Sequence, residues 1–140
     1  MILLLSSLAL AEPFRATGTL TAGADDATTP AVQFAADYGV VRHVAVLGEV
    51  GIHADGHHGL GAGLAVYPLD GRWARLGFAL VPELADPLGD PDDAYLRGRA
   101  GLRGSWLAFW GVGLAVRADA VMSAERPLGW EWGAGLSVRM

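Results

Sequence analysis

The chain has 140 residues, of which 52% are hydrophobic and 20 are glycine, and its formal net charge is −5. This length suits a single domain, and no stretch approaches the ~20 consecutive apolar residues of a membrane-spanning helix. The acidic balance argues against nucleic acid as a partner, and the absence of cysteine suits an exported chain.

An apolar segment, Met1–Ala11, opens the chain and ends in small residues. Ala9 and Ala11 stand at the two positions that a signal peptidase reads. The segment is short and has no Lys or Arg before its apolar run. We expect a signal peptide at residues 1–11 and a mature, exported chain at residues 12–140.

Alternating side chains follow from Phe14 to Met140, in segments of roughly ten residues separated by turn signals. The last segment places apolar side chains on one face and Glu131 and Arg139, among small residues, on the other. A soluble core that buried both faces would also bury these charges. The pattern predicts an all-β, eight-stranded antiparallel up-and-down transmembrane barrel, with strands near 14–24, 31–41, 45–54, 59–68, 72–82, 94–102, 106–118 and 128–139.

The expected connections alternate in length. Long loops are predicted at Asp25–Pro30, Asp55–His58, Glu83–Asp93 and Asp119–Pro127, and short turns at Arg42–Val44, Leu69–Gly71 and Arg103–Ser105. In bacterial barrels the termini and short turns face the periplasm, so this alternation predicts the orientation. Turns of three residues would place Val41 opposite Ala45, Tyr67 opposite Trp73, and Leu102 opposite Trp106.

The face predicted to meet lipid carries no charge. Trp106 and Trp110 are expected near the periplasmic end and Trp130 and Trp132 near the outer end, where aromatic girdles lie. The other large outward residues are expected to be Phe14, Leu20, Val32, Phe34, Tyr38, Val40, Val46, Val50, Ile52, Leu60, Leu64, Val66, Leu76, Phe78, Leu80, Val112, Leu114, Val116, Leu128, Leu136, Val138 and Met140.

This architecture resembles the eight-stranded outer-membrane barrels of the OmpA transmembrane-domain and OmpX type, over nearly all of the mature chain. Leu136, Val138 and Met140 resemble the final-strand assembly signal of these proteins, with Met140 in place of the usual aromatic residue. The resemblance implies a place in the bacterial outer membrane, insertion by the outer-membrane assembly machinery, and contact with outer-membrane lipids and lipopolysaccharide.

Charged residues alternate with small ones on the face predicted to line the lumen. An eight-stranded barrel is barely wider than the side chains inside it, so buried charges must pair. We expect Asp37 opposite Glu49, with Arg97 and Arg99 as their cations, whereas Arg15, Arg75 and Arg139 have no obvious acidic partner. The predicted network that plugs the lumen is structural and consists of Asp37, Glu49, Arg97, Arg99, Arg117, Asp119 and Glu131.

The residues at the outer end also allow a catalytic or a metal-binding interpretation. Ser123 and Asp119 could join His53, His57 or His58 in a hydrolytic constellation, although shared loops are a weak signal for one. His53, Asp55 and His57 alternate as metal ligands would on one face of an extended chain, and the acidic loop with Asp86, Asp90, Asp92 and Asp93 could add oxygen ligands.

Solvated loops remain the better interpretation of these residues. We therefore expect a barrel with a structural, adhesion or membrane-integrity role, without catalytic residues, bound metal or cofactor. One alternative is an outer-membrane enzyme that modifies lipid at the extracellular rim. Another is a secreted lipocalin-like barrel with apolar residues inside and charges outside.

Overall fold

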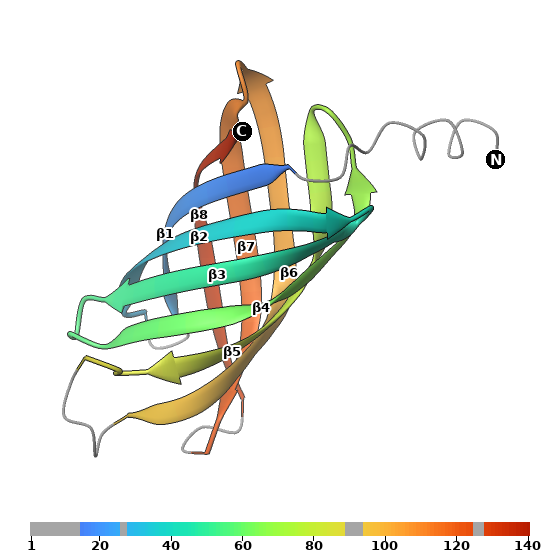
Figure 1. Ribbon diagram of the computed structural model, residues 1–140. Coiled ribbons are helices and arrows are strands. Elements are labelled where there is room, and N and C mark those ends of the chain that lie inside the picture. The colour runs from blue at the N-terminus through green and yellow to red at the C-terminus, as the bar shows by residue number, and fades with distance from the viewer. Residues whose placement is uncertain (1–14, 26–27, 89–93, 125–127) are drawn as a thin grey trace.

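The computed structural model describes residues 15–25, 28–88, 94–124 and 128–140. No helix among these residues is long and apolar enough to cross a membrane. Figure 1 shows the strands, which are β1 (Ala16–Asp25), β2 (Pro30–Val41), β3 (Val44–His53), β4 (His58–Asp70), β5 (Ala74–Ala85), β6 (Tyr95–Phe109), β7 (Val112–Ser123) and β8 (Gly129–Arg139). The expected signal peptide, Met1–Ala11, lies outside the described residues.

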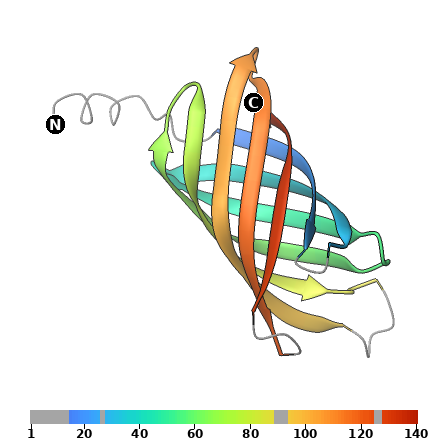
Figure 2. The same ribbon diagram turned by 180° about the vertical axis from the view of Figure 1, so that it is seen from behind.

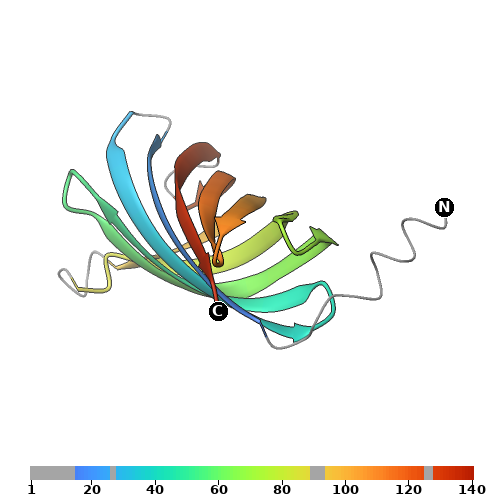
Figure 3. The same cartoon turned by 90° about the horizontal axis from the view of Figure 1, so that it is seen from above.

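The eight strands form one closed antiparallel barrel. Each strand pairs with its neighbours in the chain, and β8 returns to β1, where Leu136 pairs with Leu20. The tilted strands wind around a common axis in the views from the front, from behind and from above (Figures 1, 2 and 3). The predicted fold class is confirmed, and closure leaves the sheet without an unpaired edge.

The outer surface is apolar. Phe34 is 55% exposed and Leu80 is 64% exposed, and the other large residues expected on this face are exposed as well, except Phe14, which lies outside the described residues. Because contiguous apolar surface of this extent is rare on water-soluble monomers, it marks a face that meets another apolar phase. The lipocalin-like arrangement, with apolar residues inside and charges outside, is wrong.

Hydrophobic residues, most of them alanines, fill part of the interior. Their buried cluster lies on β2 to β5 and contains Ala35, Ala45, Leu47, Ala65, Tyr67, Ala79 and Val81. The remaining inward positions are largely polar or charged. Each strand therefore alternates between the lipid-facing side and the lumen, as expected from a side-chain period of two.

The connection between β6 and β7 differs from the prediction. Arg103–Ser105 is not a turn but lies inside β6, and the chain turns at Trp110 and Gly111. Both residues of this turn have positive φ, 54° and 78°, which is the backbone of a type I′ hairpin and matches the twist of the flanking strands. Leu102 consequently pairs with Ala118 instead of Trp106.

The other two short turns are also displaced. Val41 pairs with Val44 across Arg42 and His43, and a register shift between Gly39 and Val41 restores the alternation of faces. The β4–β5 connection spans residues 71–73, so the expected pair of Tyr67 and Trp73 does not form. Bulges absorb the extra residues and keep the apolar side chains facing outward.

Three of the four long connections are shorter than predicted because the strands extend further, and the β3–β4 connection keeps its predicted four residues. The four connections span residues 26–29, 54–57, 86–94 and 124–128, and the strand ends that they join lie at the end of the barrel opposite the short turns. Asp119 and Ser123, expected in the last loop, belong to β7. The alternation of long and short connections persists, and we call the two ends of the barrel the loop end and the turn end.

Candidate functional site

Arg99 lies at the centre of the charged lumen. Its side chain comes from β6, is almost fully buried, and has four carboxylates around it. The guanidinium is 2.7 Å from Glu83, 3.1 Å from Asp119, 3.1 Å from Glu131 and 3.5 Å from Glu49. One planar group with five N–H donors can serve several acceptors at once, which a lysine ammonium would do less well.

Arg103 and Arg117 add further hydrogen bonds to the carboxylates around Arg99. Arg103 donates to Asp119 and, over 2.8 Å, to Glu49. Arg117 donates to Asp119 over 2.8 Å and to Glu131 over 3.2 Å. Arg103 was missed in the sequence because Arg-Gly-Ser is typical of a turn, although its place in β6 directs its side chain inward.

Arg97 occupies the loop-end side of the network. It donates to Glu83 and lies 3.5 Å from Glu131. His53, the last residue of β3, also points inward, with Nε2 3.8 Å from Glu131.

A second cluster lies toward the turn end. Arg75 donates to Asp37 over 3.0 Å and to Thr17 over 2.9 Å, and its guanidinium lies 3.7 Å from the centre of the Tyr67 ring. Tyr67 in turn donates to Asp37 over 3.0 Å, and Arg75 is 3.0 Å from Asp70.

The predicted pairing of Asp37 with Glu49 is therefore wrong. In the observed register Asp37 pairs with Leu47, and Ala35 pairs with Glu49, so the two carboxylates belong to different clusters. The expectation that Arg75 and Arg139 lack acidic partners is also wrong, because Asp70 lies 3.0 Å from Arg75 and 4.0 Å from Arg139. The β2–β3 turn is one residue shorter than predicted and the register shift beside it adds a second residue, so the pairing moves by two residues in all; such a bulge has no clear sequence signal.

A small cavity separates the two clusters. Its volume is about 30 Å³, which is room for about two water molecules. Its polar lining includes Thr21, Gln33, Asp37, Arg75, Arg103 and Arg117.

The described lumen is balanced in formal charge. Asp37, Glu49, Glu83, Asp119 and Glu131 face Arg75, Arg97, Arg99, Arg103 and Arg117. Burial of ions costs several kcal/mol each unless opposite charges and hydrogen bonds offset it, and here every one of these carboxylates has a guanidinium partner. Since arginine N–H donors occupy their oxygens, these carboxylates are poorly placed to exchange protons with a substrate.

At the loop end a hydrogen-bonded clasp joins two connections. His57 Nδ1 lies 2.7 Å from Asp86 Oδ2, and the His58 backbone N–H donates to Asp86 Oδ1 over 2.9 Å. The His58 side chain accepts a hydrogen bond from the Leu88 N–H over 3.0 Å. Asp86 has a positive φ of 54°, a conformation that an aspartate adopts only at some cost, so these bonds hold a bent backbone.

This clasp shifts two pKa values. The hydrogen bond to Asp86 raises the pKa of His57 above its usual value of 6.5, helped by the nearby negative charge. Burial by itself would raise the pKa of Asp86, but the hydrogen bonds from His58 and His57 outweigh it and lower the pKa below 3.8. Each group therefore favours the charged form of the other.

Within the described residues, members of the alternative sites lie in separate surroundings. Asp119 is fully buried among arginines, away from the rim, and His53 points into the lumen while His57 contacts Asp86. His57 and Asp55 lie 4.0 Å apart, but the part of the chain that the structure describes contains no group of three or more metal-ligating side chains. Asp90, Asp92 and Asp93 lie outside that part.

No protein-family model matches the chain, and no curated protein matches it in sequence. Similar solved structures exist. A de novo designed transmembrane β-barrel aligns with a TM-score of 0.71 at 13% identity, covering 92% of this chain and 98% of the design. The N-terminal barrel domain of Pseudomonas aeruginosa OprF aligns with a TM-score of 0.70 at 8% identity, covering 91% and 98%.

Neisserial surface protein A aligns with a TM-score of 0.57 at 13% identity, covering 89% of this chain and 94% of that protein. The similarity spans complete barrels, whereas the identities are too low to carry over any binding residue. With its closed strands, apolar exterior and charged lumen, this chain has the fold of the small eight-stranded outer-membrane barrels.

Proposed function

We propose that this protein is a non-catalytic barrel of the bacterial outer membrane with a structural, adhesion or membrane-integrity role. The observation that carries the proposal is the division between an apolar exterior and a charge-paired lumen. A water-soluble barrel would be unstable with this exterior, while a bilayer solvates it. The proposed partners are outer-membrane lipids, lipopolysaccharide and the outer-membrane assembly machinery.

The ends of the barrel are the surfaces left for interaction, since side chains occupy the lumen. Outer-membrane barrels direct their long loops outward, so the loop end would face the surroundings of the cell. The attachment invasion locus protein Ail of Yersinia pestis aligns over 92% of this chain with a TM-score of 0.55, which supports a surface role for such a barrel. The enzyme alternative has less support, because Asp119 is enclosed among arginines.

Cell fractionation and labelling test the proposal. The full chain should fractionate with the outer membrane and migrate differently on gels before and after heating. Leu88→Cys at the loop end should react with a membrane-impermeant maleimide in intact cells, whereas Trp110→Cys at the turn end should react only after lysis. Both positions are highly exposed, so they form a matched pair.

Recovery of the chain in a soluble fraction would contradict the membrane assignment. Labelling of Trp110→Cys but not Leu88→Cys in intact cells would show that the turn end, and not the loop end, faces outward. A change in host lipids that depends on His57 and Ser123 would favour the enzyme alternative.

A further inference from the structure

The two ends of the barrel differ in charge. Arg15, Arg42, Arg72 and Arg139 lie at the turn end, where Asp70 is the described acidic side chain outside the lumen clusters and lies 4.0 Å from Arg139. The described acidic residues beyond the lumen at the loop end are Asp25, Asp55 and Asp86, with His57 and His58 beside Asp86. The loop sequences add Asp26, Asp90, Asp92, Asp93 and Glu125 against Arg126. Because the lumen is balanced, the net positive charge gathers at the turn end.

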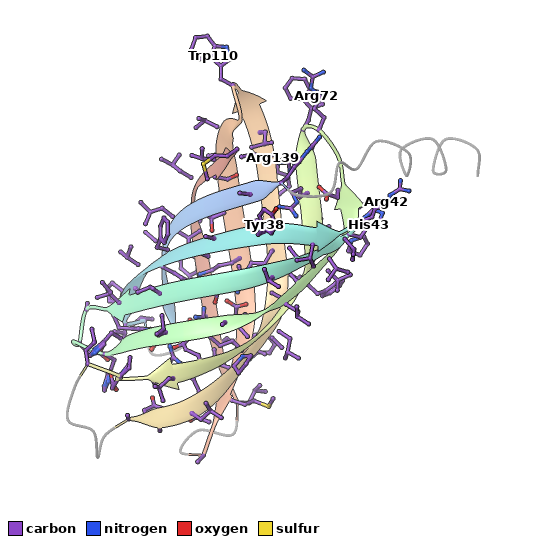
Figure 4. The ribbon with its side chains drawn as sticks, viewed as in Figure 1. Tyr38, Arg42, His43, Arg72, Trp110 and Arg139 are labelled. Atoms are coloured by element: carbon purple, nitrogen blue, oxygen red, sulfur yellow. The ribbon has the colours of Figure 1, made fainter. Side chains whose placement is uncertain are left out.

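Arg42 and Arg72 are the accessible cations of this end. Both are exposed, and neither lies within salt-bridge distance of an acidic group in the described residues. Figure 4 shows both side chains reaching away from the barrel. The Arg72 guanidinium lies over the Trp73 ring, 5.1 Å from its centre, which stabilises the cation without neutralising it.

Hydrogen bonds within the protein hold both turns in place. Arg139 donates to the carbonyl of Gly71 over 2.9 Å and to that of Arg72 over 3.3 Å. His43, next to Arg42, accepts a backbone hydrogen bond from Tyr67 over 2.8 Å, and its Nδ1 lies 2.8 Å from the Tyr67 carbonyl. Arg139 and His43 are thus positioning residues. They hold the backbone of the two turns, which lowers the entropic cost of binding a ligand at Arg42 and Arg72.

Aromatic side chains mark the membrane interface at the same end. Trp73 is 58% exposed, and Trp110, at the tip of the β6–β7 turn, is 99% exposed. Tyr38 and Trp106 are also exposed, and Tyr38 and Trp110 appear at this end in Figure 4. Tryptophan and tyrosine favour the headgroup level of a bilayer, so the arginines beside them would sit at the depth of lipid phosphates.

We propose that the basic rim, defined as Arg42 and Arg72 with Trp73 and Trp110, binds the phosphate groups of anionic phospholipids in the leaflet at the turn end. The inference rests on the proposed membrane location. Arg42 and Arg72 stand on separate turns and do not form one cradle, so a row of lipid headgroups fits them better than a single free phosphate. Guanidinium groups pair favourably with phosphate oxygens.

Lipid selectivity of the purified full chain tests this rim. The protein is folded into phosphatidylcholine bilayers, and electron spin resonance compares how strongly spin-labelled phosphatidylglycerol and phosphatidylcholine associate with it. We expect a preference for phosphatidylglycerol that falls up to about fivefold for each arginine replaced in Arg42→Gln and Arg72→Gln, which corresponds to about 1 kcal/mol. Arg72→Lys should retain the preference, and Asp55→Asn, which alters one charge at the loop end, should leave it unchanged.

The outcomes separate this inference from the proposed function. If the two lipids associate equally with a barrel that inserts and fractionates with the outer membrane, lipid binding by the basic rim is wrong and the proposed function stands. Failure to insert into any bilayer would overturn both proposals. If inorganic phosphate displaces phosphatidylglycerol more strongly than sodium chloride of equal ionic strength, the rim is a free-anion site and the lipid assignment is wrong.

Discussion

Arg99 shows why the lumen depends on pairing. Four carboxylates converge on one guanidinium; Arg103 binds the other oxygens of Asp119 and Glu49, and Arg117 shares the Asp119 and Glu131 oxygens with Arg99. Removing the central cation would leave those carboxylates close together and away from water. A broken buried network costs more than an absent one, because the remaining ions keep their desolvation penalty.

Arg99→Ala should therefore lower the free energy of unfolding by about 3–5 kcal/mol. Arg42→Ala, which trims an exposed turn residue, should change it by no more than about 0.5 kcal/mol. Urea unfolding in neutral detergent micelles, followed by tryptophan fluorescence, measures both. Equal midpoints for the two variants would show that the lumen network adds nothing to stability.

The clasp between His57 and Asp86 should respond to pH in a defined window. Because the pKa of His57 is raised, its contact with Asp86 contributes fully to the free energy of unfolding below pH 6.5. This contribution declines as the pH rises through the pKa of His57 in the folded protein. Because the pKa of Asp86 is lowered, its contacts contribute fully to the free energy of unfolding above pH 3.8. This contribution declines as the pH falls through the pKa of Asp86 in the folded protein. The clasp is thus strongest between these limits.

An NMR titration of the His57 ring should give a midpoint above 6.5, and Asp86→Asn should lower it. The same variant should speed hydrogen exchange of the His58 backbone N–H, which donates to Asp86. An unchanged His57 midpoint in Asp86→Asn would contradict the contact.

At the scale of the strand, glycine serves different purposes on the two faces. Gly135 lies on the lumen side of β8, where a Cβ atom would collide with the Leu20 carbonyl and lie 2.8 Å from the Thr21 Cα on β1. Gly48 lies on the outer face of β3, where a Cβ atom would have no neighbour within 4 Å. Glycine on the lumen side thus permits the close strand approach of a tightly curved sheet.

Gly135→Ala should destabilise the barrel by about 1–3 kcal/mol through overpacking. Gly48→Ala should leave it unchanged or stabilise it by about 0.4–1 kcal/mol, because alanine reduces the conformational freedom of the unfolded chain. Heat-modifiable gel mobility across a urea series compares the pair. Equal losses in both variants would mean that strand curvature does not depend on the lumen glycine.

At the scale of the whole molecule, the lumen is filled along its charged section. Arg99, Glu83 and Asp119 are fully buried, and the cavity beside this group holds only about two water molecules. An eight-stranded barrel has no spare width for a channel beside such side chains.

The purified protein in planar bilayers should accordingly show no stable conductance. Arg99→Ala combined with Arg103→Ala removes two of the side chains that cross the lumen and should permit at most brief, irregular openings. Stable single-channel currents from the unmodified protein would contradict the closed lumen.

The alternation of side chains by itself determined the number of strands, the apolar exterior and the inward direction of the charges. Those features depend on a period of two, which any strand must obey wherever it begins or ends. Even the misplaced turns left the faces correct for Trp106 and Leu76, since bulges restored the alternation.

Partners across the lumen were decided by the tertiary structure alone. Asp37 contacts Arg75 instead of sharing cations with Glu49, because a two-residue turn and a bulge together shift the β2–β3 register. Arg103 enters the network because Trp110 and Gly111 form the turn that Arg-Gly-Ser mimics in the sequence. Side chains that meet across a barrel come from strands far apart in the chain, so their contacts depend on register and closure together, which local patterns do not encode.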